Sequence, residues 1–303
     1  MGSPLLDRPG AVAGRGVDGG VAAHYGDPFR EQRTLIESGA VVDRSHRGVV
    51  RVSGADRLSW LHSLTSQHHE SQPAGEPREA LILSPHGHVE HHLVVVDDGA
   101  QTWLTAEPQS ADSLVAYLNS MRFMLRVEVE DLSGSYGVVS EVADGAVRDH
   151  IVGLDEVASW VSSSPLPLVG HDAWEAHRVA RHVPRLGFET DHRTIPHEVG
   201  WIGVAVHLDK GCYRGQETVA RVHNLGRPPR RLVFGHLDGT QDQLPDPHTP
   251  VELDGRAVGF LGTAVHHAEL GPIALAVVKR ATPDGAPLTT AGMAMKIERV
   301  VDA

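Results

Sequence analysis

The sequence predicts an α+β fold with mixed N-terminal and middle parts and a small β-barrel at the C-terminal end. Strand and helix patterns follow one another over residues 29–182 with short connections, without the regular βαβ spacing of a parallel sheet. After Arg227-Pro228-Pro229 the pattern changes to short strands that Gly, Pro and Asp turns separate, which is typical of a closed or nearly closed barrel. The 32 glycines and 19 prolines agree with many turns.

Apolar spacing predicts the individual elements. Helices are expected over Phe29–Ser38, over the stretch that carries Leu58, Leu61 and Leu64, and over Ser110–Met121 and Asp172–His182. Strands are expected over Gly48–Ser53, Ala80–Leu83, Val89–Val96, Gln101–Ala106, Val127–Leu132 and Tyr136–Val142. Barrel strands are expected over Arg230–His236, Val251–Leu253, Ala257–Val265 and Ile273–Val278. We therefore predict a flexible Gly-rich tail over residues 1–26, a two-part region over 27–226 and the barrel over 227–303.

Composition excludes several classes of protein. The 303 residues are 41% hydrophobic and 22% charged, which is ordinary for a globular chain, and no apolar run is long enough for a membrane span. The charge sum of 27 − 39 = −12 disfavours a protein that works through the nucleic-acid backbone. Without a secretory signal, and with a single cysteine that cannot form a disulfide within the chain, we expect a cytoplasmic protein.

The most informative segment is Lys210-Gly211-Cys212-Tyr213-Arg214-Gly215-Gln216-Glu217. Two glycines enclose the only cysteine, and glycine permits positive φ or a close backbone approach. A helix from Gln216 would direct its N-terminal dipole at this loop, which favours an anion or a thiolate.

Two interpretations of this segment are possible, a ligand site or a structural turn. Between Leu208 and Arg231 the chain carries six cationic residues and two acidic ones, Asp209 and Glu217. This excess of positive charge suits an anionic ligand. The six are Lys210, Arg214, Arg221, Arg227, Arg230 and Arg231. Alternatively, Cys212 is a small buried apolar residue and the glycines only make turns.

Residues 210–217 resemble the K-G-C-Y-x-G-Q-E signature of the YgfZ family, folate-binding proteins related to the glycine cleavage T-protein, an aminomethyltransferase. The mitochondrial iron–sulfur assembly factor is in the same family. The resemblance continues through Thr218–Arg221, and Thr194–Glu198 and Gly259–Thr263 also fit. It implies a ring-like architecture that binds tetrahydrofolate or a related folate and supports iron–sulfur proteins or their assembly machinery.

The same resemblance implies roles for individual residues. Cys212, Lys210 and Tyr213 would carry the chemistry, with Cys212 as the key residue. Gln216, Glu217, Arg221, Arg214, Trp201 and Arg231 would bind the cofactor.

Two positions depart from the transferases. Gly87–His92 carries imidazoles where they have an aspartate pair, and an imidazole does not supply a carboxylate's fixed negative charge at neutral pH. Ala180 stands where they have a glutamate that holds the pterin, so Glu175, Glu189 or Glu198 would have to substitute.

Histidines are numerous, 21 in all, and four of them, His86, His88, His91 and His92, crowd the hairpin over residues 80–96. On a strand, His91 and His92 must face opposite ways, so at most two or three of the four converge. A metal site with His88, His91 and His92 as ligands is one interpretation, and a solvated strand face is the other.

Three functions follow as hypotheses. The first is a folate-binding accessory protein for iron–sulfur proteins, acting on a small-molecule folate and protein partners, with no nucleic acid and no membrane. The second is an enzyme, a tetrahydrofolate-dependent one-carbon (aminomethyl) transferase. The third is a haem- or metal-binding protein that uses the His86–His92 cluster. One cysteine cannot hold an iron–sulfur cluster alone, because ordinary clusters need about four thiolates.

Overall fold

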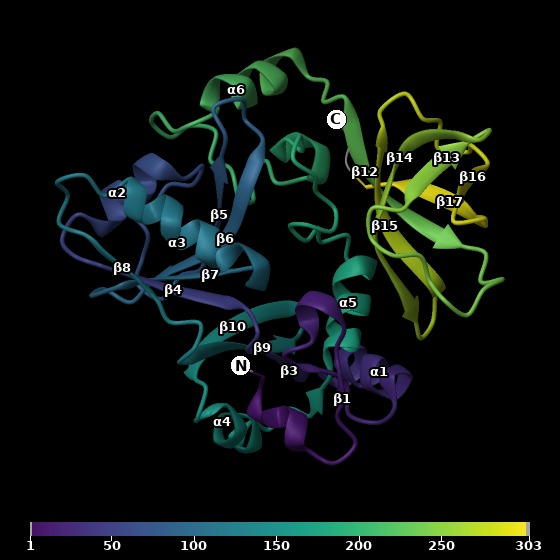
Figure 1. Cartoon of the computed structure of the whole chain (residues 1–303), viewed down its shortest axis with the longest axis horizontal. Coiled ribbons are helices and arrows are strands. Elements are labelled where there is room, and N and C mark those ends of the chain that lie inside the picture. The colour runs from purple at the N-terminus through teal and green to yellow at the C-terminus, as the bar shows by residue number, and fades with distance from the viewer. Residues whose placement is uncertain (1, 301–303) are drawn as a thin grey trace. The chain divides into compact units, whose positions relative to one another are not determined.

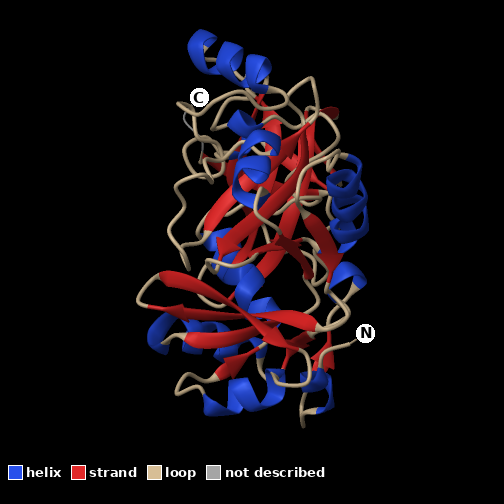
Figure 2. Cartoon of the chain, turned by 90° about the vertical axis from the view of Figure 1, so that its left-hand side faces the viewer, coloured by secondary structure: helices blue, strands red, loops and turns tan. Residues whose placement is uncertain are grey.

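The computed structural model describes residues 2–300, which form two compact units (Figure 1). The first contains residues 2–62, 68–79 and 91–174, and the second contains residues 63–67, 80–90 and 175–300. The chain thus passes between the units several times. The predicted α+β class is confirmed, since helices and mainly antiparallel sheets occur together (Figure 2).

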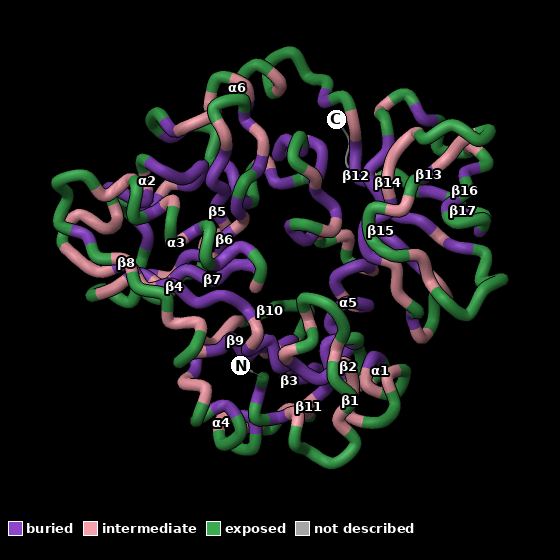
Figure 3. Tube along the Cα trace, viewed as in Figure 1, coloured by how far each residue is buried: buried purple, intermediate pink, exposed green. Residues whose placement is uncertain are grey.

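A four-stranded sheet in the order β10-β9-β3-β11 organises half of the first unit. Leu35, Val42 and Trp174 lie in the apolar cluster on one face, and Leu5, Val41 and Val157 lie in the cluster on the other. All five residues of β3 are buried, because successive side chains of the strand enter opposite clusters (Figure 3). The elements of this part are α1 (Pro28–Ser38), β3 (Ala40–Arg44), β9 (Tyr136–Ala143), β10 (Ala146–Gly153), α4 (Val157–Ser163) and β11 (Leu168–Val169).

A five-stranded antiparallel sheet in the order β5-β6-β7-β4-β8 carries the histidine-rich hairpin. The base of the β5–β6 hairpin belongs to the first unit, and its tip, residues 80–90, belongs to the second. Its elements are β4 (Gly48–Ser53), α2 (Arg57–Leu64), β5 (Arg78–Leu83), β6 (Val89–Asp97), β7 (Thr102–Ala106), η3 (Pro108–Ser110), α3 (Ala111–Ser120) and β8 (Glu128–Asp131).

The N-terminal segment differs from the flexible tail that its glycines suggest. It forms η1 (Pro4–Asp7), β1 (Val12–Ala13), η2 (Gly16–Asp18) and β2 (Ala22–His24), and β1 pairs with β2. Leu5 and Val21 are buried. The prediction was wrong because the glycines were taken to indicate a flexible backbone, whereas Gly16 adopts a φ of +55° in an ordered turn.

The second unit contains the predicted barrel, which is confirmed as a closed sheet of six strands in the order β12-β15-β14-β13-β16-β17. Val233 and Leu237 of β12 enter the barrel's own cluster, while Leu232 and Phe234 enter a second cluster that contains Tyr213 and Trp201. The elements are α5 (His171–Ala180, which begins in the first unit), η4 (Pro196–Val199), α6 (Gln216–Leu225), β12 (Arg230–Leu237), β13 (Pro250–Leu253), β14 (Arg256–His267), β15 (Gly271–Lys279), β16 (Leu288–Thr290) and β17 (Met293–Arg299).

Each predicted helix and strand corresponds to an element of the structure, while β3, β10, α4, β11, β16 and β17 were not predicted. Across residues 2–300, no helix combines the length and the hydropathy that a membrane crossing requires.

Candidate functional site

Two buried side chains, Lys210 and Tyr213, anchor the loop over residues 210–215. The Lys210 ammonium donates a hydrogen bond of 2.6 Å to the Thr65 carbonyl and lies 4.9 Å from the centre of the Tyr213 ring. Burial raises the pKa of Tyr213 to about 12, so its phenol is neutral at physiological pH. Cys212, between these anchors, is exposed. The alternative of a buried structural cysteine is therefore wrong.

Two glycines bring this loop against the tip of the β5–β6 hairpin. Gly215 has a φ of +83°, and a Cβ there would lie 2.6 Å from the Ser84 carbonyl oxygen and 3.0 Å from the Cα of Gly87. Gly87 has a φ of +78°, and a Cβ there would lie 2.8 Å from the Cβ of Thr218. Only glycine fits both positions, so the cysteine loop and the hairpin turn form one packed structure.

Polar contacts fix the rest of the loop. The Arg214 guanidinium pairs with Glu90 at 3.1 Å, and the Gln216 side chain donates to the Lys210 carbonyl at 3.4 Å. Gly215 is the N-cap of α6, whose first backbone N–H, at Gln216, donates to the Tyr213 carbonyl at 3.2 Å. The charges of Lys210 and Arg214 are thus directed to Thr65 and Glu90.

The expected cationic patch is smaller in the structure than in the sequence. Arg230 forms ion pairs of 2.7 Å with Asp191 and with Glu198. Burial alone would raise the pKa of Asp191, but the hydrogen bonds from Arg230 outweigh it and hold that pKa below its usual range. Within residues 2–300, Arg221 and Arg227 are the exposed cations of this group without a side-chain partner.

Trp201 and Arg231 do not reach the exposed surface of the loop. Trp201 is 2% exposed and lies in the same core cluster as Tyr213, so it supports the loop from within. Arg231 is 3% exposed and bonds to the Thr282 carbonyl and to Asp284 at 2.7 and 2.6 Å. It alternates with Leu232, which enters that cluster, and so points to the other face of β12.

The three glutamates that could replace the missing pterin ligand are all held by arginines. Glu175 bonds to Arg178 at 2.6 Å, and Glu189 accepts bonds from Arg178 and from the Thr263 backbone at 3.2 and 2.7 Å. Glu198 is occupied by Arg230 at 2.7 Å. Each of these three carboxylates therefore already accepts hydrogen bonds from protein donors in this structure.

The metal site expected from His88, His91 and His92 is not assembled. His91 is 6% exposed, burial lowers its pKa to about 4, and its Nδ1 has no hydrogen-bond partner in the described chain. His92 lies on the opposite face of β6 and pairs with Glu79 at 2.7 Å. His88 lies instead near His86, with ring centres 6.2 Å apart. Close ligand groups within residues 2–300 occur elsewhere, at Asp18, His46 and His171 and at His62, His68 and Glu70.

Sequence reasoning missed Thr65, Gly87 and Glu90 as positioning residues of the cysteine loop. The glycine in the turn of the hairpin was a signal of tight geometry. No local pattern indicates which distant segment a turn contacts.

Comparison with known proteins gives the following similarities. No family model matches the chain. A chloroplastic protein of Arabidopsis thaliana named as a transferase is 24% identical over 311 residues, 85% of this chain and 69% of that protein. The tRNA-modifying protein YgfZ of Vibrio atlanticus is 24% identical over 183 residues, 59% of this chain and 56% of that protein. The mitochondrial iron–sulfur cluster assembly factor IBA57 homolog of Mycosarcoma maydis is 25% identical over 221 residues, 62% of this chain and 55% of that protein.

The chain thus spans little more than half the length of the last two relatives. The crystal structure of the glycine cleavage system aminomethyltransferase T from Bartonella henselae superposes with a TM-score of 0.83. It covers 98% of this chain and 95% of that one at 15% identity, which confirms the fold.

Proposed function

Because the chain is similar in sequence to a YgfZ protein and an IBA57 homolog and in fold to an aminomethyltransferase, we propose that it is a folate-binding accessory protein for iron–sulfur proteins. It would support their assembly, repair or activity, with Cys212 as its key residue. The observation that carries the proposal is the exposure of the only cysteine on a loop that buried Lys210 and Tyr213 hold in place. Such a loop offers the thiol to a partner without reorganising.

The thiol count limits what Cys212 does. A cluster needs about four thiolates, and each chain has one cysteine. Cys212 would therefore supply one ligand of a cluster that a partner completes, or protect a partner's cluster. Proteins that assemble or contain iron–sulfur clusters are accordingly the proposed partners.

The folate fits residues on α6 better than the buried glutamates. Glu217 and Arg221 are exposed and stand four positions apart, so both lie on one face of the helix. A pterin presents N–H donors that a carboxylate accepts, and a folate tail ends in carboxylates that a guanidinium binds. Glu217 would thus orient the pterin and Arg221 the tail, while Gln216 is held against the Lys210 carbonyl.

The transferase alternative has less support. A neutral His91 and a Glu79-paired His92 occupy the region where the transferases carry aspartates, and neither supplies their free carboxylate.

Calorimetric titration of the full chain with tetrahydrofolate tests the folate part. We expect micromolar binding by wild type and by Cys212→Ala, because the thiol lies outside the proposed ligand contacts. Arg221→Met should weaken binding about tenfold or more through the lost charge-assisted bond. Arg227→Met, which changes another exposed arginine beyond α6, should leave binding unchanged. Absence of binding at millimolar tetrahydrofolate would contradict the folate assignment.

A further inference from the structure

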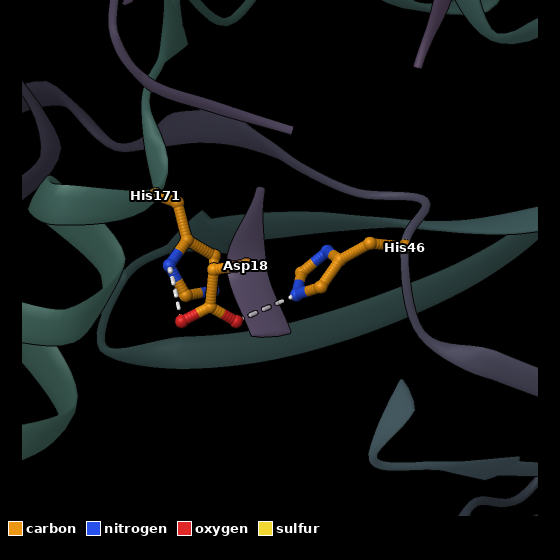
Figure 4. Close-up of side chains that lie close together, drawn as sticks. All are labelled: Asp18, His46 and His171. Atoms are coloured by element: carbon orange, nitrogen blue, oxygen red, sulfur yellow. Dashed lines mark hydrogen bonds and ion pairs between the residues drawn. The ribbon is translucent and has the colours of Figure 1, made fainter. Parts of the chain in front are cut away.

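An Asp18–His46–His171 cluster in the first unit lies outside everything assigned to function above. Figure 4 shows the Asp18 carboxylate between the two imidazoles, with one oxygen directed at each. Asp18 Oδ1 lies 3.0 Å from His46 Nε2, and Asp18 Oδ2 lies 4.0 Å from His171 Nδ1. The three donor atoms all fall within 4.8 Å of one another.

These separations match a transition-metal site. Zinc binds histidine nitrogen and carboxylate oxygen at about 2.0–2.2 Å, so two donors at a tetrahedral angle lie about 3.3 Å apart. The two nitrogens lie 3.0 and 4.0 Å from different oxygens of the Asp18 carboxylate, and one donor atom from each residue falls within 4.8 Å of the other two. Small rotations of the side chains would therefore bring all three donors to one ion.

Burial distinguishes this cluster from surface histidines. The side chains of His46 and His171 are each 5% exposed and that of Asp18 is 16% exposed. The rings meet edge to face with centres 5.1 Å apart. His46 Nδ1 is buried and finds no hydrogen-bond partner in the described chain. The contact with Asp18 thus supplies the polar anchor of that ring.

The glycine-rich segment is built to deliver Asp18 to this place. A Cβ at Gly14 would collide with the Asp18 carbonyl, and the Asp18 N–H donates to the Arg15 carbonyl at 3.0 Å. His46 comes from the turn between β3 and β4, and His171 is the first residue of α5. Three distant stretches of sequence therefore converge on one carboxylate, which indicates a preorganised site.

We propose that Asp18, His46 and His171 bind one divalent transition-metal ion of the zinc or ferrous type. Two imidazoles and a carboxylate are ligands that such ions accept, and three protein ligands leave a coordination position for water or an added ligand. The ion would join the N-terminal segment to the β3–β4 turn and to the start of α5. The proposal does not depend on folate binding or on Cys212.

Metal titration of the untagged full chain tests it. After chelator treatment, wild type should bind one Zn²⁺ in competition with a chromophoric chelator. Asp18→Asn and His46→Gln keep the approximate side-chain size and should each weaken that binding by about 100-fold. His68→Gln removes one imidazole from the more exposed His62–His68–Glu70 group and should leave it unchanged. Equal affinity in wild type, Asp18→Asn and His46→Gln would overturn the proposal.

A second measurement needs only the wild type, in case the variants fail to fold. One equivalent of Co²⁺ should give ligand-field absorption bands and broaden the amide resonances next to Asp18, His46 and His171. Broadening confined to other histidines, or no bands at one equivalent, would overturn the proposal.

Discussion

Gly87 and Gly215 touch backbone to backbone, since a Cβ on Gly215 would stand only 3.0 Å from the Cα of Gly87. Both have φ near +80°, at +78° and +83°. Because the tip of the hairpin and the cysteine loop meet through these two residues, the position of Cys212 depends on both.

Gly215→Ala should reduce the free energy of unfolding by about 2–4 kcal/mol, because it adds a clash with the Ser84 carbonyl to the strain of a positive φ. Gly226 ends the same helix at a φ of +72°, and a Cβ added there would meet no atom within 4 Å. Gly226→Ala should therefore cost only the strain, about 1–2 kcal/mol. Urea denaturation of both variants measures the difference, and equal losses would show that the close approach does not exist.

Arg178 is 3% exposed and holds the two carboxylates of Glu175 and Glu189. Arg178→Met should destabilise the chain by about 3–5 kcal/mol, because it removes a cation that contacts both buried carboxylates and leaves Glu175 with the longer pairing with Arg185 at 3.5 Å. Arg51→Met breaks the more exposed Arg51–Glu130 pair and should cost about 0–1 kcal/mol. Urea denaturation compares the two variants, and a loss below about 1 kcal/mol in Arg178→Met would contradict the buried cluster.

Stability should fall as the pH is lowered from about 6.5 to about 4, because buried His91 is neutral in the folded chain. Burial lowers its pKa to about 4, so between these values the unfolded chain binds the proton and the folded chain does not. This contribution is fully present above pH 6.5 and is lost toward pH 4. It amounts to about 3 kcal/mol.

His91→Leu should reduce the difference in stability between about pH 8 and about pH 4 by about that amount. Some difference should remain, because burial also lowers the pKa of His177 and of His197 to about 4. His86→Gln removes an exposed imidazole and is the control. An unchanged pH profile in His91→Leu would place His91 in solvent.

Lys210→Met should destabilise the chain by about 1–3 kcal/mol and increase the rate of protease cleavage at the cysteine loop. The variant loses the charge-assisted bond to Thr65 and the cation above Tyr213. Arg221→Met, on exposed α6, should change stability by less than about 0.5 kcal/mol. Identical denaturation midpoints for the two variants would mean that Lys210 does not anchor the loop.

Local patterns predicted much of the fold because they report local physics. The alternating Val50 and Val52 of β4 and the 3–4 spacing of Leu58, Leu61 and Leu64 each identify a face that must be buried. β10 was not predicted, since its first residues, Ala146–Arg148, are exposed and lack alternation. The exposure of Cys212 was not predictable either, because it depends on whether Lys210 and Tyr213 turn inward.

The histidines illustrate the same limit. Four of them crowd one hairpin, yet adjacent residues of a strand face opposite ways, so density along the chain does not produce convergence. Asp18, His46 and His171 converge without any local spacing. A Gly-rich segment was interpreted as flexible, although its glycines make the turn that positions Asp18.

The proposed support of iron–sulfur proteins by Cys212 is tested most directly by one measurement of enzyme activity. In a host that lacks its own YgfZ-like protein, the specific activity of an iron–sulfur enzyme is compared after expression of wild type, Cys212→Ser or Arg227→Met at equal protein levels. We predict that wild type and Arg227→Met restore the activity and that Cys212→Ser does not. Equal restoration by Cys212→Ser would contradict the role assigned to the thiol.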